Sequence, residues 1–157
     1  MPVPTSFIEA FSTEAIVVEI QSDAKRDIVG ELVSAAVKGG VLPKGRKEQA
    51  VDLLMAREDR GSTGLGRGIA IPHAKIPGLR KQCGVMARST EGVDFKAVDG
   101  EPVYALVMMI SPESREDEHL HALRWISGMA RDPDFTSFIR QATTAEQIYD
   151  VLVERSG

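Results

Sequence analysis

The sequence predicts a single α/β domain in which helices pack on the faces of one sheet. The chain has 157 residues, which suits one domain with a sizeable core. Segments with strand periodicity and segments with helix periodicity are mixed along its length, a pattern typical of this class. The run VYALVMMI, residues 103–110, is continuously apolar, which indicates a strand covered on both faces.

The chain is expected to begin with an arm and a short strand. Residues 1–12 contain two prolines and are expected to form a loosely held N-terminal arm, so that the domain proper spans residues 13–157. Residues 15–20, AIVVEI, are rich in β-branched side chains and indicate a strand.

Two helices are expected next. The first has Ser22 or Asp23 as its candidate N-cap and ends at Gly39 and Gly40. The second covers residues 47–59. Apolar side chains recur at helical spacing in both: Ile28, Val29, Leu32, Val33 and Ala36 in the first, and Ala50, Val51, Leu54 and Met55 in the second.

Three strands and two helices are expected in the rest of the chain. The strands cover residues 68–74, 83–89 and 103–110, with an Asp-Gly turn before the third and Ser111 and Pro112 at its end.

A helix over residues 115–131 follows and is broken by the segment DPDF. The last helix opens with a capping box from Thr143 to Glu146. Its apolar stripe is Ala145, Ile148, Tyr149 and Leu152.

Composition narrows the classes of function. The chain is 43% hydrophobic and 27% charged, an ordinary composition for a soluble domain. Its net charge of -4 argues against a nucleic acid or an anionic membrane as a partner. Neither a membrane-spanning run nor a secretory signal is recognisable. Cys83, the single cysteine, cannot form an internal disulfide, so we expect a cytoplasmic protein.

The segment GSTGLGRGIAIPHAK, residues 61–75, is the most unusual stretch. It fails the P-loop pattern because Arg67 and Gly68 replace the lysine and the hydroxyl residue, and it fails the dinucleotide pattern at Ile69. It also leads into a strand, whereas both nucleotide motifs lead into a helix. Two interpretations stay open, a plain turn or a loop whose backbone N–H groups and hydroxyls cradle an anion.

His73 follows this loop and also allows two interpretations. It could be a strand histidine whose ring nitrogens are satisfied by neighbours, which is the commoner case. It could instead be a nucleophile or a phosphoryl acceptor, because neutral imidazole is nucleophilic near neutral pH. Pro72 would hold the backbone before the ring.

The other two histidines lie on one predicted helix. His119 and His121 are two residues apart, roughly 200° around the helix axis, so they cannot bind one metal ion together. The predicted inward face consists of Leu120, Leu123, Ile126, Ser127 and Ala130. His119 lies on this face and His121 lies away from it, so only His119 is expected to reach a site.

Three ordered segments together resemble a known family: AREDRGSTGLGRGIAIPHAK, DGEPVYALVMMISPES and EHLHALRWISGMARDPDF. They are similar to the EIIA domain of the fructose/mannitol class, a part of the bacterial phosphoenolpyruvate-dependent sugar phosphotransferase system. The length and the H-L-H step are most similar to the nitrogen-regulatory branch. The resemblance implies an α/β sandwich with a mixed central sheet flanked by helices.

The resemblance also implies a site. His73 would accept a phosphoryl group from the phosphocarrier HPr or its nitrogen-type paralogue, with His119 and Arg57 assisting. Ser62, Thr63 and Gly64 would bind the phosphoryl oxygens.

No cofactor and no metal are expected at this site. An apolar rim for the donor is expected to include Ile76, Pro77 and Leu65.

Two roles are compatible with such a site. A regulatory EIIA would be a switch whose phosphorylation state controls its binding to a target protein. A transport EIIA would pass the phosphoryl group to an EIIB partner for uptake of a fructose- or mannitol-type sugar. We favour the regulatory role, and in either role the chain is a phosphotransferase component without membrane insertion.

Overall fold

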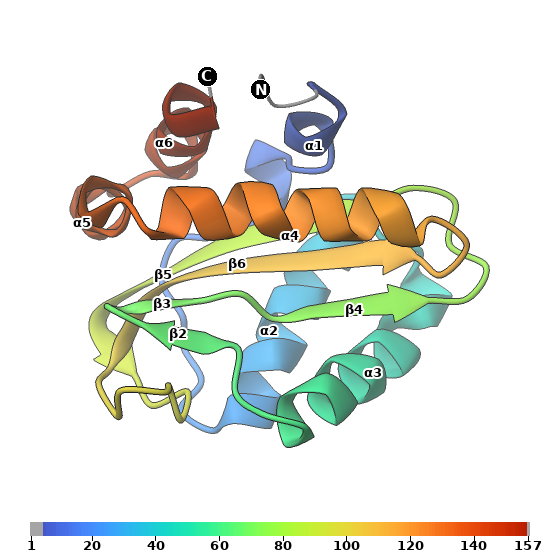
Figure 1. Ribbon diagram of the computed structural model, residues 1–157, viewed down its shortest axis with the longest axis horizontal. Coiled ribbons are helices and arrows are strands. Elements are labelled where there is room, and N and C mark those ends of the chain that lie inside the picture. Colours follow the sequence, from blue (N-terminus) through green and yellow to red (C-terminus); the bar gives the residue numbers. More distant parts are fainter. Residues whose placement is uncertain (1–4, 157) are drawn as a thin grey trace.

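The computed structural model describes residues 5–156. Six strands form one sheet in the order β1-β5-β6-β3-β2, and β4 also pairs with β6 (Figure 1). The strands are β1 Ile16–Val17, β2 Gly64–Gly66, β3 Ile69–Ala70, β4 His73–Ile76, β5 Cys83–Val93 and β6 Val103–Pro112. Strand β5 pairs with β6 and β2 with β3 in antiparallel fashion, whereas β1–β5, β3–β6 and β4–β6 are parallel. The expected mixed sheet is therefore confirmed.

Helices cover both faces of the sheet (Figure 1). On one face lie α2 Lys25–Lys38 and α3 Lys47–Asp59, and on the other lie α1 Thr5–Glu9, α4 Glu116–Ala130, α5 Pro133–Gln141 and α6 Ala145–Ser156. Short 3-10 turns occupy Thr13–Ala15 and Lys44–Arg46. Among the described residues, no helix combines the length and the apolar character needed to cross a membrane.

Strand β6 shows why its sequence is apolar throughout. Leu106, Met108 and Ile110 belong to the core on the α2 side, whereas the intervening Val107 and Met109 belong to the core on the α4 side. Side chains alternate between the two faces of a strand, so a strand between two helical layers needs apolar residues at every position. The prediction of a doubly covered strand is confirmed.

The predictions for α2 and α3 were accurate in extent, but the predicted caps of α2 and α6 were not. Helix α3 has the predicted bounds, and all five predicted apolar positions of α2 are buried. The N-cap of α2 is Ala24, with no side-chain cap, so the choice of Ser22 or Asp23 was wrong. At α6 the cap is displaced by one residue, because the Thr144 hydroxyl accepts the hydrogen bond from the Gln147 N–H.

Two predicted strands differ in the structure. The strand expected over residues 68–74 is divided into β3 and β4, because Pro72 between them has no N–H to donate. The Pro72 carbonyl still accepts from the Met109 N–H at 2.9 Å, so both pieces run alongside β6. The strand expected over residues 15–20 contains only Ile16 and Val17.

Helix α5 was not predicted. The segment DPDF was interpreted as a break, and it does end α4. It also starts the next helix, because Asp132 accepts a hydrogen bond from the Asp134 N–H and Pro133 occupies the first helical turn.

The segment before β1 packs against α4. Residues 1–4 of the predicted loose arm lie outside the described residues, but Phe7 and Phe11 are buried beside Trp125, with ring centroids 5.7 and 6.2 Å from its ring. Gly84 on β5 makes room for Phe11, since a Cβ atom there would lie 2.4 Å from the Phe11 ring. This part of the arm therefore belongs to the core.

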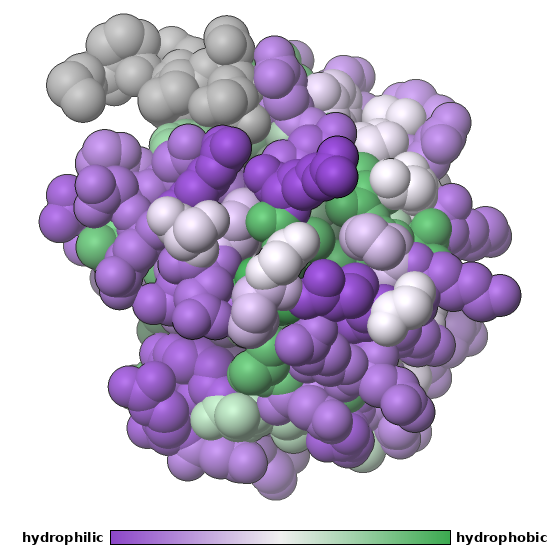
Figure 2. Space-filling view, turned by 90° about the vertical axis from the view of Figure 1, so that its right-hand side faces the viewer, coloured by the Kyte–Doolittle hydropathy of each residue, from purple (hydrophilic) through white to green (hydrophobic). Residues whose placement is uncertain are grey.

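Figure 2 looks onto the end of the molecule where β4 and β6 finish. Most of this surface is hydrophilic, and hydrophobic side chains are exposed only in small patches between polar ones.

Candidate active site

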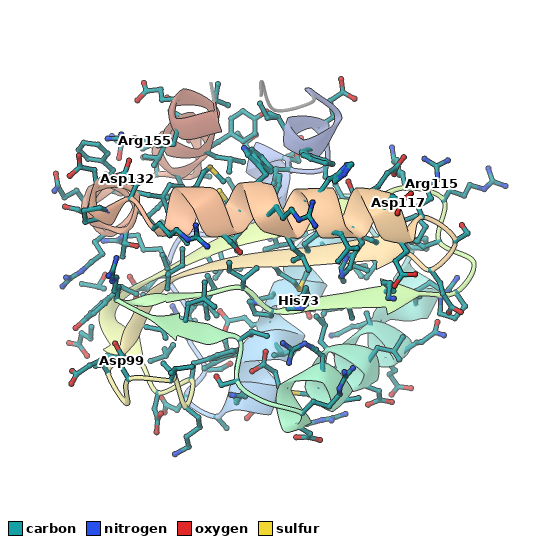
Figure 3. All side chains as sticks on the ribbon, in the orientation of Figure 1. His73, Asp99, Arg115, Asp117, Asp132 and Arg155 are labelled. Carbon is teal, nitrogen blue, oxygen red and sulfur yellow. The ribbon has the colours of Figure 1, made fainter. Side chains whose placement is uncertain are left out.

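A groove lies between α3, the start of β4 and the first half of α4, with a volume of about 480 Å³. Figure 3 places His73 there, between α3 and α4. The lining residues are Leu53, Ala56, Arg57, Arg60, His73, Ala74, Lys75, Glu113, His119, Leu120 and Leu123. A second hollow, of about 310 Å³ between α5 and α6, contains no histidine, arginine or lysine. The first groove therefore carries the candidate chemistry.

His73 is the first residue of β4 and is partly buried. Its Nδ1 lies 2.7 Å from the carbonyl oxygen of Ile71. A carbonyl can only accept, so Nδ1 carries the proton and donates it, and Nε2 keeps its lone pair. Burial lowers the pKa of His73, the bond to Ile71 opposes this, and the charge of Arg57 lowers the pKa further. The ring is therefore neutral near pH 7, with Nε2 available as a nucleophile.

His119 faces the same groove from α4. Its ring centroid lies 5.7 Å from that of His73, and the side chain is buried. Burial, helped by the nearby His73 and Lys75, lowers the pKa of His119 to about 4, so this ring is also neutral near pH 7. His121 is exposed, as the helix phase predicted.

The inward face of α4 was predicted only in part. The buried residues are His119, Ala122, Ile126, Met129 and Ala130. Leu120, placed on that face by the sequence pattern, is 46% exposed and lines the groove. An apolar residue at a site rim has the same sequence signature as one in the core.

The predicted apolar rim also differs. Ile76 is fully buried, and Leu65 lies on β2 with 48% of its surface exposed. The apolar groove residues are instead Leu53, Leu120 and Leu123, together with two alanines.

Three cations line the groove. Arg57, in the last turn of α3, donates from Nη1 to the carbonyl oxygen of Gly61 at 2.8 Å. Arg60 was not singled out from the sequence but also lines the groove. Lys75 lies beside His73 on β4 and forms an exposed ion pair with Glu116 at 3.0 Å. The groove therefore has the charge needed to hold an anion.

The polar groups of the glycine-rich segment that were predicted to bind the phosphoryl oxygens have partners within the protein. Ser62, Thr63 and Gly64 do not line the groove. The Gly64 N–H donates to the Ser62 hydroxyl at 3.0 Å, and this hydroxyl donates to the carbonyl oxygen of Phe95 at 3.2 Å. The segment continues as the β2–β3 hairpin, whose turn holds Arg67 and Gly68 at positive φ. Hence the glycines provide turn geometry and close packing.

Thr63 has a partner that the sequence analysis missed. Its N–H donates to Glu58 at 3.1 Å, and its hydroxyl donates to the other carboxylate oxygen. Glu58 is 5% exposed and pairs with the Lys25 ammonium at 3.0 Å, which also lies 4.5 Å above the Phe95 ring. The Lys25 ammonium also lies 3.5 Å from the Ser62 hydroxyl, and we call Lys25, Glu58, Ser62 and Thr63 the Glu58 cluster.

A signal for this cluster was present in the sequence. Glu58 follows Leu54 by four residues and therefore lies on the buried face of α3. A carboxylate at such a position needs a partner, because burying an unpaired charge is very costly.

No metal site accompanies the groove. Within residues 5–156, no group of three or more His, Cys, Asp or Glu side chains is arranged to hold a metal ion.

The fold is an α/β sandwich with a groove that contains two histidines, and solved EIIA structures share this fold. The crystal structure of the nitrogen regulatory protein IIA-Ntr from Neisseria meningitidis superimposes with a TM-score of 0.83 at 29% identity, covering 92% of this chain and 97% of that one. A complex of enzyme IIA-Mtl with phosphorylated enzyme IIB-Mtl from Escherichia coli matches with a TM-score of 0.73 at 18% identity, covering 92% of this chain and 97% of that one, which shows the shared fold.

Sequence comparison gives the family. Residues 9–155 match the family described as "Phosphoenolpyruvate-dependent sugar phosphotransferase system, EIIA 2". A nitrogen regulatory protein from Bradyrhizobium diazoefficiens is 36% identical over 140 residues, which are 88% of this chain and 89% of that protein. The chain belongs to the EIIA 2 family and is a component of the phosphotransferase system.

Proposed function

We propose that the chain is a phosphoryl carrier of the nitrogen-regulatory type, acting in the cytoplasm. His73 accepts the phosphoryl group on Nε2 from HPr or a nitrogen-type paralogue. The observation that carries this proposal is the bond between Nδ1 of His73 and the Ile71 carbonyl at 2.7 Å. That bond leaves the Nε2 lone pair as the nucleophile of a neutral ring.

The groove supports this transfer chemically. The Nε2 lone pair forms a bond to phosphorus, while the phosphorus–nitrogen bond of the donor's phosphohistidine breaks and its electron pair returns to the donor ring. The group brings roughly two negative charges, so its binding needs fixed positive charge and hydrogen-bond donors. Arg57, Arg60 and Lys75 line the groove and can supply that charge. We assign Arg57 and His119 the assisting roles.

The regulatory role rests on the relatives. The nitrogen regulatory proteins from Bradyrhizobium diazoefficiens and Neisseria meningitidis match this chain over 89% and 97% of their own length, the first in sequence and the second in structure. We propose that phosphorylation of His73 changes the charge of the groove from positive toward neutral. A target protein that contacts the groove and its apolar rim would then distinguish the two forms.

Incubation with phosphoenolpyruvate and purified general phosphotransferase proteins tests the proposal. Intact mass should increase by one phosphoryl group, which acid removes, and peptide mapping under neutral conditions should place the group on His73. A His121→Ala chain is the matched control and should be labelled at the wild-type rate. Labelling at any residue other than His73, or no labelling by either HPr type, contradicts the proposal.

A further inference from the structure

We propose that Gln82 and Ser111 are positioning residues that fix the proton of His119 on Nε2, so that this nitrogen presents an N–H donor to the groove. The arrangement is a chain of three hydrogen-bonded side chains from the β4–β5 loop, the end of β6 and α4. Ser111 is fully buried, and its hydroxyl lies 2.6 Å from Nδ1 of His119 and 3.1 Å from Nε2 of Gln82.

The side-chain amide of Gln82 determines which group donates each of these hydrogen bonds. Its amide nitrogen lies 3.1 Å from the backbone carbonyl oxygen of Glu118 as well as 3.1 Å from the Ser111 hydroxyl. A carbonyl oxygen only accepts, so the group that faces it must be the NH₂ and not the amide oxygen. The second hydrogen of this NH₂ is then available for the Ser111 oxygen.

The hydrogen bond from Gln82 to Ser111 determines how Ser111 bonds to His119. Its oxygen already accepts from Gln82, and among the described residues the one remaining partner for its own proton is Nδ1 of His119. The hydroxyl therefore donates to Nδ1, which must be the unprotonated nitrogen of the neutral ring. The ring proton lies on Nε2, across the ring from Ser111.

The two groove histidines are consequently in opposite tautomers. His73 donates from Nδ1 to the Ile71 carbonyl and offers a lone pair at Nε2. His119 accepts at Nδ1 and offers a proton at Nε2. A nucleophile and a hydrogen-bond donor face one groove, and the donor can bind an oxygen of the group that the nucleophile receives. This consequence rests on the proposed function, whereas the tautomer itself does not.

Nitrogen NMR of the unphosphorylated full chain tests the tautomer directly. The chain has three histidines, so the ring nitrogens of each can be assigned, and exposed His121 serves as the internal reference. At a pH of about 8 the His73 and His119 rings are expected to be neutral, because burial lowers the pKa of both. His73 should be protonated on Nδ1 and His119 on Nε2. A His119 ring protonated mainly on Nδ1 overturns the proposal.

Gln82→Glu should reverse the direction of the hydrogen bonds from residue 82 through Ser111 to His119. A carboxylate can only accept, so Ser111 would donate to it and accept from His119, and the ratio of the two His119 tautomers should shift toward Nδ1–H by about tenfold. Gln141→Glu is the matched control, since Gln141 donates to the Ser137 hydroxyl at the same 3.1 Å on α5. An unchanged His119 tautomer in Gln82→Glu overturns the proposal.

Phosphoryl transfer provides a second measurement. Ser111→Ala and Gln82→Glu should slow labelling of His73 by roughly fivefold to tenfold, the effect of one hydrogen bond, whereas Ser111→Thr keeps the hydroxyl and should recover most of the rate. Gln82 is half-buried, so its variant remains informative if Ser111→Ala does not fold. If the wild type is not phosphorylated, the proposed function fails and the NMR result still decides the tautomer.

Discussion

Arg57 and Glu58 are consecutive residues at the end of α3, yet they serve two polar regions that differ in kind. Arg57 lines the groove with His73 and His119. Glu58 lies under the glycine-rich segment, where Lys25 and both donors of Thr63 surround its carboxylate. In the Glu58 cluster the protein itself satisfies the charges, whereas the groove holds neutral rings and cations that face solvent.

The two regions differ in whether their polar groups still have capacity to bind a ligand. A buried polar group whose hydrogen bonds are complete contributes to the unfolding free energy and has little capacity left for a ligand. A group with a free lone pair or charge facing a groove can bind or react, and its removal changes the fold little. Substitutions in the two regions should therefore separate transfer from stability.

The largest expected effect is the loss of phosphoryl acceptance in His73→Ala. No other groove residue combines a neutral ring with a free lone pair, because the His119 ring is directed differently by Ser111. Labelling by the phosphorylated donor should fall below detection, while the thermal midpoint changes little because the ring is only partly buried. Labelling of His73→Ala at the wild-type rate would show that His73 is not the phosphoryl acceptor.

Glu58→Ala should have the opposite profile. It leaves the Lys25 ammonium largely buried without its partner, a change that typically costs about 3–5 kcal/mol in unfolding free energy. Denaturant unfolding measures this loss. The control is Glu116→Ala, which breaks the exposed ion pair with Lys75 and should cost at most about 1 kcal/mol. Equal losses from both substitutions would show that the cluster does not stabilise the fold.

Arg57→Lys tests whether Arg57 binds the phosphoryl group through its planar guanidinium or only supplies a positive charge. The planar guanidinium donates to the Gly61 carbonyl and can still direct other N–H groups at a phosphoryl oxygen, a geometry that lysine lacks. Transfer should fall by one to two decades, equivalent to about 1.5–3 kcal/mol for a charged hydrogen bond. The thermal midpoint should hardly change, because the positive charge at the end of α3 is kept. A wild-type transfer rate in Arg57→Lys would show that Arg57 serves only as a positive charge at the end of α3.

The last expected effect is the contribution of the groove histidines to the pH dependence of stability. The pKa of His119 is about 4 in the fold and 6.5 for an ordinary histidine, so between these values the unfolded chain binds more protons. Its contribution to stability is complete above pH 6.5 and is lost as the pH falls toward 4; the lowered pKa of His73 acts in the same direction. From pH 7 to pH 5 the His119 contribution should decrease by about 2 kcal/mol.

Denaturant unfolding of the wild type and of His119→Asn at both pH values isolates this term. Carboxylates contribute to the pH dependence of both chains, so they cancel in the difference. Identical slopes in the two chains would mean that His119 is not held neutral by the fold.

Much of the fold was predictable because its signals are local. The bounds of α3 and the buried positions of α2 follow from apolar residues at helical spacing, and β6 follows from one uninterrupted apolar run. Helix α5 was missed although its signals are local as well. An Asp-Pro pair ends one helix and caps the next, and only the first of these meanings was considered.

The site was predictable only where a helix phase or a family motif identified a residue. His119 was separated from His121 by the phase of α4, and the groove does contain His73, His119 and Arg57. The partners of Ser62 and Ser111 could not be predicted, since Phe95 and Gln82 lie 33 and 29 residues away in the chain. Sequence reasoning recognised the polar groups of the glycine-rich segment but not that they were already occupied.

The packing of the N-terminal segment against Trp125 gives the protein an intrinsic fluorescent probe. Trp125, the only tryptophan of the chain, is stacked on Phe7 and meets the edge of Phe11, and it lies on the same helix as His119. Its fluorescence therefore depends on whether these two rings stay in place. Any ligand that displaces them, or shifts α4 beneath them, should change the emission of an unlabelled sample within the time of a single mixing experiment.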